Sequence, residues 1–148
     1  MEPKELQNYL YNHIPITKAM GVEVRESGFN KVVLCAPLAP NINHRDTVFG
    51  GSAATLAILS AWALMHIRLA NEAVPPRLVI QQNTMDYSKP ITGDFFAVCD
   101  YADNSQWERF SGTLARRGRA RITVPAVLQC LGEEVANFEG RFVALKPR

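Results

Sequence analysis

The sequence predicts an α+β domain in which an antiparallel sheet wraps around one long helix. Residues 52–71 are apolar on every helical face, so a helix formed by them must be surrounded by the rest of the protein. Segments with the alternation and turn residues of β-strands lie on both sides of this run, at 21–36 and from 78 onwards. Because one sheet has to cover the helix, a curved antiparallel sheet is the simplest arrangement.

Length and composition indicate a single domain. The chain has 148 residues, of which 47% are hydrophobic and 20% are charged. This is enough to bury a core without disulfides, and neither a repeat nor a flexible linker divides the sequence. We therefore expect residues 1–148 to form one domain. The formal net charge of +2 gives no overall attraction to nucleic acids or membranes, so any important basic patch must be local.

Three features bear on the cellular compartment. Cys35, Cys99 and Cys130 are odd in number and far apart, which predicts buried free thiols in place of a zinc site or disulfides. Acidic residues near the amino terminus argue against a signal peptide. The apolar run 53–65 is shorter than the roughly 18 to 20 residues of a membrane-spanning helix. We expect a cytoplasmic protein without a membrane segment.

The first part of the chain predicts a short helix and a hairpin. Residues 4–13 place apolar side chains at helical spacing and end before Pro15, as in an amphipathic helix. The β-like segments 21–26 and 31–36 flank a turn at 27–30. We expect them to pair as the first hairpin of the sheet.

The part after the long helix is interpreted as about four strands. Residues 78–87 and 94–101 predict a second hairpin. Residues 103–114 predict a short irregular or helical connection between strands. Further strands are expected at 119–131 and 136–145, the last of which alternates between apolar and polar residues over most of its length.

The polar loop before the long helix is the segment best suited to chemistry. It spans residues 41–52 and ends in Gly50, Gly51 and Ser52 at the amino end of the helix. A helix amino terminus offers unpaired N–H donors and a positive dipole, and two glycines let a ligand atom approach the backbone closely. The pattern predicts an oxyanion site. The alternative is that the glycines only form a tight turn into the helix.

Two motifs resemble those of the hotdog-fold acyl-CoA thioesterases. Their loop pattern, Asn-x-x-x-Thr-x-(His or Phe)-Gly-Gly before a central helix, matches Asn43, Thr47, Phe49, Gly50 and Gly51. The later segment 86–94, D-Y-S-K-P-I-T-G-D, is similar to a turn common in hotdog proteins.

A narrower similarity involves the approach Pro40-Asn41-x-Asn43, the segment 49–52 and Trp62. These residues resemble the thioesterase-like domain of the YiiD carboxy-terminal type, which in some bacteria follows an N-acetyltransferase domain. The resemblance covers the chain from about residue 16 to residue 145.

The resemblance implies a helix wrapped by five or six strands, homodimers joined edge to edge, and acyl-thioester sites at the dimer interface. A homotetramer, as a dimer of dimers, is a further option. The amides Gln81, Gln82 and Asn83, inside the strand 78–87, need cross-strand or intersubunit partners. The implied activity is hydrolysis of an acyl-CoA or acyl carrier protein thioester in fatty acid metabolism. Coenzyme A enters as part of the substrate, and no metal or other cofactor is expected.

The resemblance also implies roles for the loop residues. Gly50 and Gly51 would donate backbone N–H groups to the thioester carbonyl, and Asn43 would orient the water or the carbonyl. Many relatives carry an Asp or Glu on the central helix where this chain has Ile58. Thr55, near the same helical face, is placed to hold a water, but a hydroxyl without a base activates water poorly.

The general base must therefore come from elsewhere. Asp46 and His44 in the loop and Asp86 on the following strand are the candidates, and we favour Asp46 because loop side chains most easily reach the water. The alternative for Asp46 is a cap or turn role, and for His44 a hydrogen bond within the loop. His66, on the apolar helix, is interpreted as a histidine of the core or of an interface.

Substrate contacts are expected from the loop and from a basic cluster. On a strand, Arg117, Arg119 and Arg121 would point to one side and suit the phosphates of coenzyme A or the acidic surface of an acyl carrier protein. A solvated sheet edge protected by charge is the alternative. The other expected substrate-binding residues are His44, Phe49, Ser52 and Asp86.

Two other function classes stay open. A non-catalytic protein that binds acyl thioesters is favoured by the missing helix carboxylate. A dehydratase would need a histidine paired with a carboxylate around the substrate.

Overall fold

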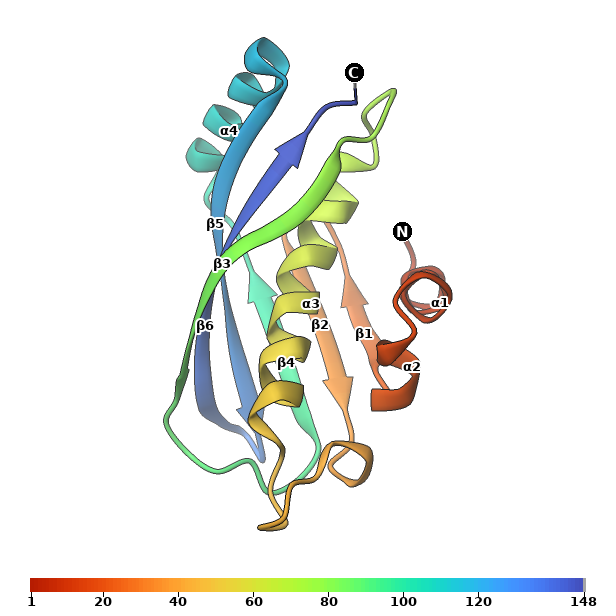
Figure 1. Cartoon of the computed structure of the whole chain (residues 1–148), viewed down its shortest axis with the longest axis vertical. Helices are drawn as coiled ribbons and strands as arrows, with labels where there is room; N and C mark the ends of the chain where they lie inside the picture. Colours follow the sequence, from red (N-terminus) through yellow and green to blue (C-terminus); the bar gives the residue numbers. More distant parts are fainter. Residues whose placement is uncertain (148) are drawn as a thin grey trace.

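In a computed structural model, which describes residues 1–147, a long helix lies against one face of a curved antiparallel sheet (Figure 1). The sheet has six strands in the order β1-β2-β4-β5-β6-β3. The strands are β1 (Glu23–Ser27), β2 (Lys31–Ala36), β3 (Arg77–Tyr87), β4 (Phe95–Asp100), β5 (Arg119–Cys130) and β6 (Glu133–Leu145). The helices are α1 (Pro3–His13), α2 (Ile16–Met20), α3 (Gly50–Leu69) and α4 (Asn104–Arg117), with a 3-10 turn at Ala39–Asn41. This confirms the predicted α+β class and the predicted wrapping of one helix by a sheet.

The central helix α3 is surrounded because its apolar residues cover almost its whole circumference. Ala53, Leu56, Ala57 and Leu64 are fully buried, and the strands on either side supply the covering side chains. By length and composition alone α3 could cross a membrane, but 61% of its most apolar window is buried inside the fold. The burial is that of a core helix.

The first predicted hairpin is confirmed, and the second is wrong. β1 and β2 pair directly, with a bulge at Arg25. β3, however, pairs with β6 at the far edge of the sheet, whereas β4 lies between β2 and β5. Residues 88–94 connect β3 to β4 by running past the ends of β6 and β5 (Figure 1).

The length of this connection explains the error. Seven residues span up to about 23 Å, whereas the three strand spacings from β3 to β4 need only about 14 Å. Strand character and turn residues do not distinguish this crossing from a hairpin.

The connection before β5 is a helix that is longer than predicted. Asp103 caps α4 by accepting hydrogen bonds from the N–H groups of Ser105 and Gln106, and Gly118 ends it with φ +72°. Arg117 is therefore the last residue of α4 and does not stand on a strand, which corrects the expected row of Arg117, Arg119 and Arg121. A left-handed glycine one residue after Arg117 breaks the strand pattern that the row required.

The carboxyl end of α3 is held by the buried Arg68. Its guanidinium donates 2.7 Å hydrogen bonds to the carbonyls of Phe29 and Tyr101. The rings of Phe29, Tyr101 and Trp107 lie 4.3 to 5.0 Å from the guanidinium carbon. Arg68 thus connects α3 to the β1–β2 turn, to the end of β4 and to α4.

The three cysteines are buried and free, as predicted. Burial raises the pKa of the Cys99 thiol to about 12 and also raises the pKa of Cys35. Thiols held in the neutral form in this way are weak nucleophiles, so Cys35 and Cys99 serve as packing residues.

Candidate active site

The loop before α3 is organised by the side chain of Asn43. Its Nδ2 donates to Thr47 Oγ1 at 2.9 Å, and its Oδ1 accepts from the N–H groups of Arg45 and Thr47 at 2.8 and 3.2 Å. The isolated bridge between Ile42 and Val48 closes the base of the loop. Both ends of the Asn43 amide are thus engaged within the loop, where they fix the approach of the chain to α3.

Asp46 lies at the tip of this loop. Its φ of +62° is in the left-handed region, which Asp tolerates better than most residues. Its side chain is exposed and forms no ion pair among residues 1–147. His44, two residues earlier, is exposed as well. The carboxylate of Asp46 is therefore free to contact a ligand at the loop surface.

The first two N–H groups of α3 are free. Ser52 N–H and Ala53 N–H donate to Phe49 O, and Phe49 N–H donates to Asn41 O. The Gly50 and Gly51 N–H groups have no acceptor within the described chain, and no side chain caps the helix. Together with the positive end of the helix dipole, they form two adjacent donors for a partly charged oxygen.

Two aromatic rings flank these donors. The Tyr87 hydroxyl donates to Gly50 O at 2.9 Å, and the Phe49 ring lies over Gly51. A Cβ added at Gly51 would come within 2.5 Å of Phe49 Cε2, so this position requires glycine while the ring keeps its place. Phe49 and Tyr87 are 58% and 52% exposed and frame an open apolar approach to the donors.

Tyr87 is the site residue that the sequence analysis missed. It belongs to the turn motif at 86–94, but the sequence does not show that the end of β3 lies beside Gly50. The neighbouring Asp86 points to the opposite face of the sheet because side chains alternate along a strand. Asp86 is therefore turned away from the two donors.

The start of α3 brings Ser52, Thr55 and Ile58 near the site. The Thr55 hydroxyl donates to Gly51 O at 2.8 Å, so its proton is already used while its lone pairs are free. Thr55 and Ile58 are half-buried, and α3 carries no Asp or Glu over its length. The helix therefore offers no carboxylate to a ligand at Gly50.

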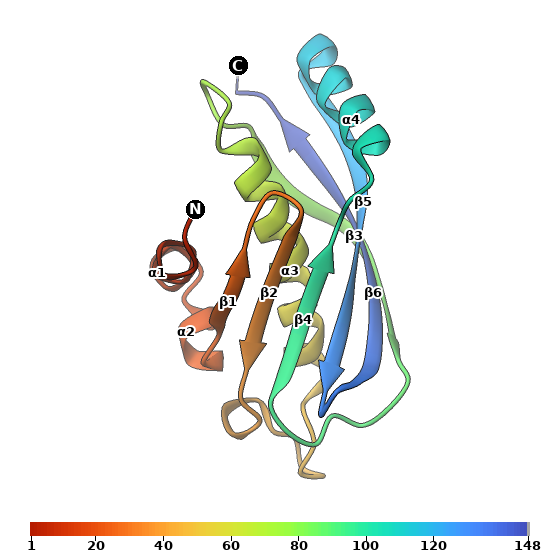
Figure 2. The ribbon, with the colours of Figure 1, turned by 180° about the vertical axis from the view of Figure 1, so that it is seen from behind.

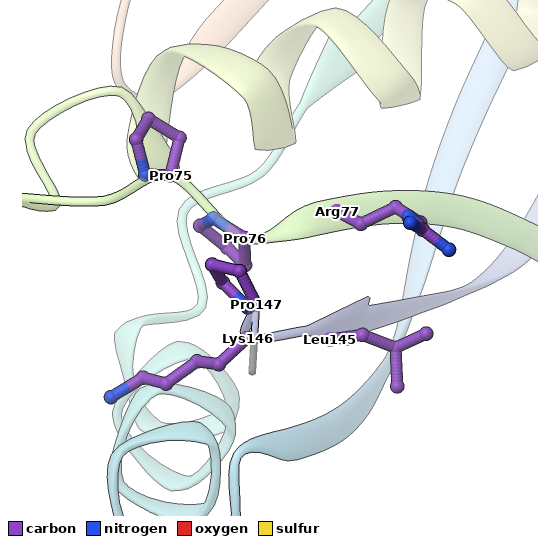
Figure 3. Close-up of a pocket in the computed structure, with 6 residues that line it drawn as sticks. All are labelled: Pro75, Pro76, Arg77, Leu145, Lys146 and Pro147. Atoms are coloured by element: carbon purple, nitrogen blue, oxygen red, sulfur yellow. The ribbon is translucent and has the colours of Figure 1, made fainter.

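A shallow groove of about 320 Å³ adjoins the loop. It runs between Thr47 and Val48 on one side and Tyr87, Lys89 and Ile91 on the other. A larger cavity of about 660 Å³ lies at the opposite end of the sheet, between the prolines after α3 and the end of β6 (Figure 3). The groove, and not the larger cavity, is next to the free N–H groups.

The two arginines of β5 lie far from the loop of their own chain. Tyr87 aligns through Ala136 of β6 with Leu128 of β5, nine residues from Arg119 and seven from Arg121. At about 3.3 Å per residue, this separation is roughly 23 to 30 Å. Arg117 lies at the same distant end, so the structure does not bring the predicted basic cluster to the predicted oxyanion site.

His66 lies in an aromatic cluster between α1 and α3. Its ring is 4.8 Å from Trp62 and 4.6 Å from Tyr9, measured between centroids, and Tyr9 stacks on His13 at 4.0 Å. Burial lowers the pKa of His66, and His13 lowers it further. The cluster is a packing feature along α3, and residues 1–147 hold no group of His, Cys, Asp and Glu side chains arranged to bind a metal.

A helix wrapped by an antiparallel sheet, with free donors at its amino end beneath a polar loop, defines a hotdog-type protein of the thioesterase class. The chain belongs to the family described as "Putative thioesterase (yiiD_Cterm)", whose profile matches residues 3–146. This confirms the resemblance found in the sequence and supports thioester hydrolysis in general.

Solved structures agree on the fold. A protein of unknown function from Chlorobaculum tepidum TLS is 28% identical with a TM-score of 0.90, covering 98% of this chain and 94% of its own. A "putative thioesterase" from Shewanella oneidensis is 24% identical with a TM-score of 0.83, covering 97% and 96%. A "probable thioesterase" from Pseudomonas aeruginosa is 22% identical with a TM-score of 0.81, covering 99% and 97%.

Proposed function

We propose that the protein hydrolyses an acyl thioester of coenzyme A or of an acyl carrier protein by direct attack of water. The observation that carries the proposal is the pair of free N–H groups at Gly50 and Gly51, framed by Phe49 and Tyr87. The scheme uses no metal or other cofactor.

In this scheme the thioester carbonyl oxygen lies against the two N–H groups. Water adds to the carbonyl carbon while Asp46 accepts its proton, and the oxygen gains negative charge in the tetrahedral intermediate. The intermediate then collapses with cleavage of the C–S bond, and the thiolate takes up the proton. A well-placed donor is worth about 3 to 4 kcal/mol of barrier, so the two donors supply the charge stabilisation, while Asp46 takes the place of the helix carboxylate as base.

The scheme includes a homodimer formed through β3. This strand is 11 residues long and lies at the edge of the sheet, so one side of its backbone has no partner strand among residues 1–147. Its middle, Gln81-Gln82-Asn83, is exposed and carries neither charge nor proline to block pairing. Antiparallel pairing of two β3 strands would continue the sheet across both copies and cover the half-buried Ile80 and Met85.

The test is release of free thiol from acyl-CoA esters of short, medium, long and aromatic chains, with acyl carrier protein esters alongside. We expect turnover well above the uncatalysed rate for at least one acyl group. Background rates with every ester on both carriers would overturn the proposal. Tight binding of an unhydrolysed ester would instead support a non-catalytic binder, which the absence of an acidic residue from α3 favours.

A further inference from the structure

The arginines of β5 belong to a basic patch on the outer face of the sheet, turned away from α3. Arg77 of β3 and Arg119 of β5 both align with Leu145 of β6, so their side chains share one face. Arg121 lies two residues along β5 on the same face, and Arg141 of β6 aligns with Thr123, two residues further. Inward-facing neighbours such as Ala120 and Phe142 are buried. We call these four arginines the outer-face patch.

The charges of the outer-face patch are uncompensated. All four arginines are exposed, and the three ion pairs found within residues 1–147 lie elsewhere. Glu139, on the same face of β6, pairs with none of them. Residues 104–148 hold 8 Lys and Arg against 4 Asp and Glu, although the whole chain has a net charge of only +2. An exposed cluster of unpaired guanidinium groups is a strong attractor for an anionic partner.

The shape of the surface favours a protein over a small molecule. Arg77 and Arg119 are two strand spacings apart, about 10 Å, and Arg121 adds about 7 Å along β5. The patch spreads over β3, β6 and β5 at the end of the sheet where β5 follows α4, an end that Figure 2 shows at the top. Small ligands are bound in concave sites that bury most of their surface, whereas an open face suits a protein surface. Arg77 is the patch member that lines the nearby 660 Å³ cavity (Figure 3).

The edge strand relates the patch to the site. Pairing over the whole of β3 about a two-fold axis places the start of one strand, at Arg77, beside the end of the other, at Tyr87. The outer-face patch of one copy then lies at the same end of the assembly as the Gly50 loop of the second copy. The patch lies on the outer face and the loop on the α3 side, so a thioester tethered to a partner on one copy has to pass around this end of the sheet to reach the loop of the other copy.

We propose that the outer-face patch docks the acidic surface of a carrier protein that delivers the acyl group on a flexible prosthetic arm. This inference rests on the proposed function and selects the carrier protein over coenzyme A as the physiological thiol. Long-range attraction between opposite charges would speed encounter and orient the carrier, as at other charge-complementary interfaces.

The experiment compares one acyl group on an acyl carrier protein and on coenzyme A. We expect Arg119→Glu/Arg121→Glu to raise KM for the carrier protein ester roughly tenfold with little change in kcat, and to leave both constants for the coenzyme A ester unchanged. The matched control is Lys4→Glu/Lys18→Glu, which makes the same charge change at exposed residues of α1 and α2. The control should affect neither ester. Arg77→Gln/Arg141→Gln provides a milder second variant.

Binding of the carrier protein, measured by fluorescence anisotropy, separates the two proposals. If neither ester is hydrolysed but the arginine variants still lose carrier binding and the control does not, the proposed hydrolysis fails and the docking surface stands. Equal losses with both esters would show that the patch binds coenzyme A phosphates and would overturn the inference. Unchanged carrier binding in both arginine variants would overturn it as well.

Discussion

The two ends of α3 are built in opposite ways. At the amino end, the N–H groups of Gly50 and Gly51 are unpaired and lie beside two exposed rings. At the carboxyl end, Arg68 is buried beneath three aromatic rings and donates to two backbone carbonyls. One end of the helix is left open, and the other is closed.

The difference shows how a helix can keep its end available to a ligand. Unpaired donors next to an open approach contribute little to stability, so the helix must be anchored elsewhere. Packing along α3 and the Arg68 contacts provide that anchor. We therefore expect substitutions at the closed end to change stability and substitutions at the open end to change turnover.

The largest expected effect is at the closed end. Arg68→Ala leaves the carbonyls of Phe29 and Tyr101 without their donor and removes the cation from between three rings, so the free energy of unfolding should fall by about 3 kcal/mol. Urea denaturation measures the change. Arg25→Ala, which removes an exposed ion pair with Glu23, is the control and should cost less than about 1 kcal/mol. Equal losses in both variants would contradict an anchoring role.

At the open end, Asp46→Asn should lower kcat roughly 100-fold, because it keeps the shape of the side chain but removes the proposed base. Steady-state hydrolysis measures it, and the unfolding midpoint should stay unchanged. Asp46→Gly is a second variant that relieves the left-handed backbone, so it should be at least as stable as the wild type and equally inactive. Full activity in Asp46→Asn would exclude Asp46 as the base.

Gly51→Ala tests the contact between Gly51 and the Phe49 ring. The new Cβ must displace the ring, which disturbs the approach to the donors, and we expect kcat to fall roughly tenfold. In the Phe49→Ala background the space is free, so the same change should have little effect. A loss of the same size in both backgrounds would show that the ring is not the cause.

Tyr87→Phe removes the hydrogen bond to Gly50 O and keeps the ring. A hydrogen bond of about 1 kcal/mol predicts a fall in kcat of roughly fivefold. Tyr11→Phe, which loses a hydroxyl bond to Val22 O outside the site, is the matched control and should leave kcat unchanged. A similar decrease in the two variants would argue for a general loss of stability.

The smallest effect concerns His66, in the last turn of α3. Because its folded pKa is lower than its ordinary value of 6.5, the unfolded chain binds its proton more readily. Stability should therefore fall as the pH drops below about 6.5, until the pH is also below the folded pKa. Thermal unfolding at pH 7.5, 6.5 and 5.5 measures how stability changes with pH. His66→Gln should weaken this pH dependence, and an unchanged pH dependence would assign the effect to another group.

The open end was largely predictable from the sequence, and the closed end was not. Gly50 and Gly51 stand directly before an apolar run, so their place at a helix start follows from local pattern. The partners of Arg68 come from residues 29 and 101, which are 39 and 33 positions away. Tyr87 was missed for the same reason, since its contact with Gly50 crosses 37 positions.

The sequence alone determined the fold class, the central helix, the first hairpin and the position of the polar loop before α3, because each depends on short-range periodicity and turn residues. Only the tertiary structure decided which strands are neighbours, and so corrected the second hairpin. It also extended α4 to Arg117, which removed this residue from the arginine row. It also separated the β5 arginines from the loop and brought Arg77 and Arg141 beside them. Strand order depends on how the chain crosses the sheet, a long-range choice among pairings that the local pattern leaves nearly equivalent.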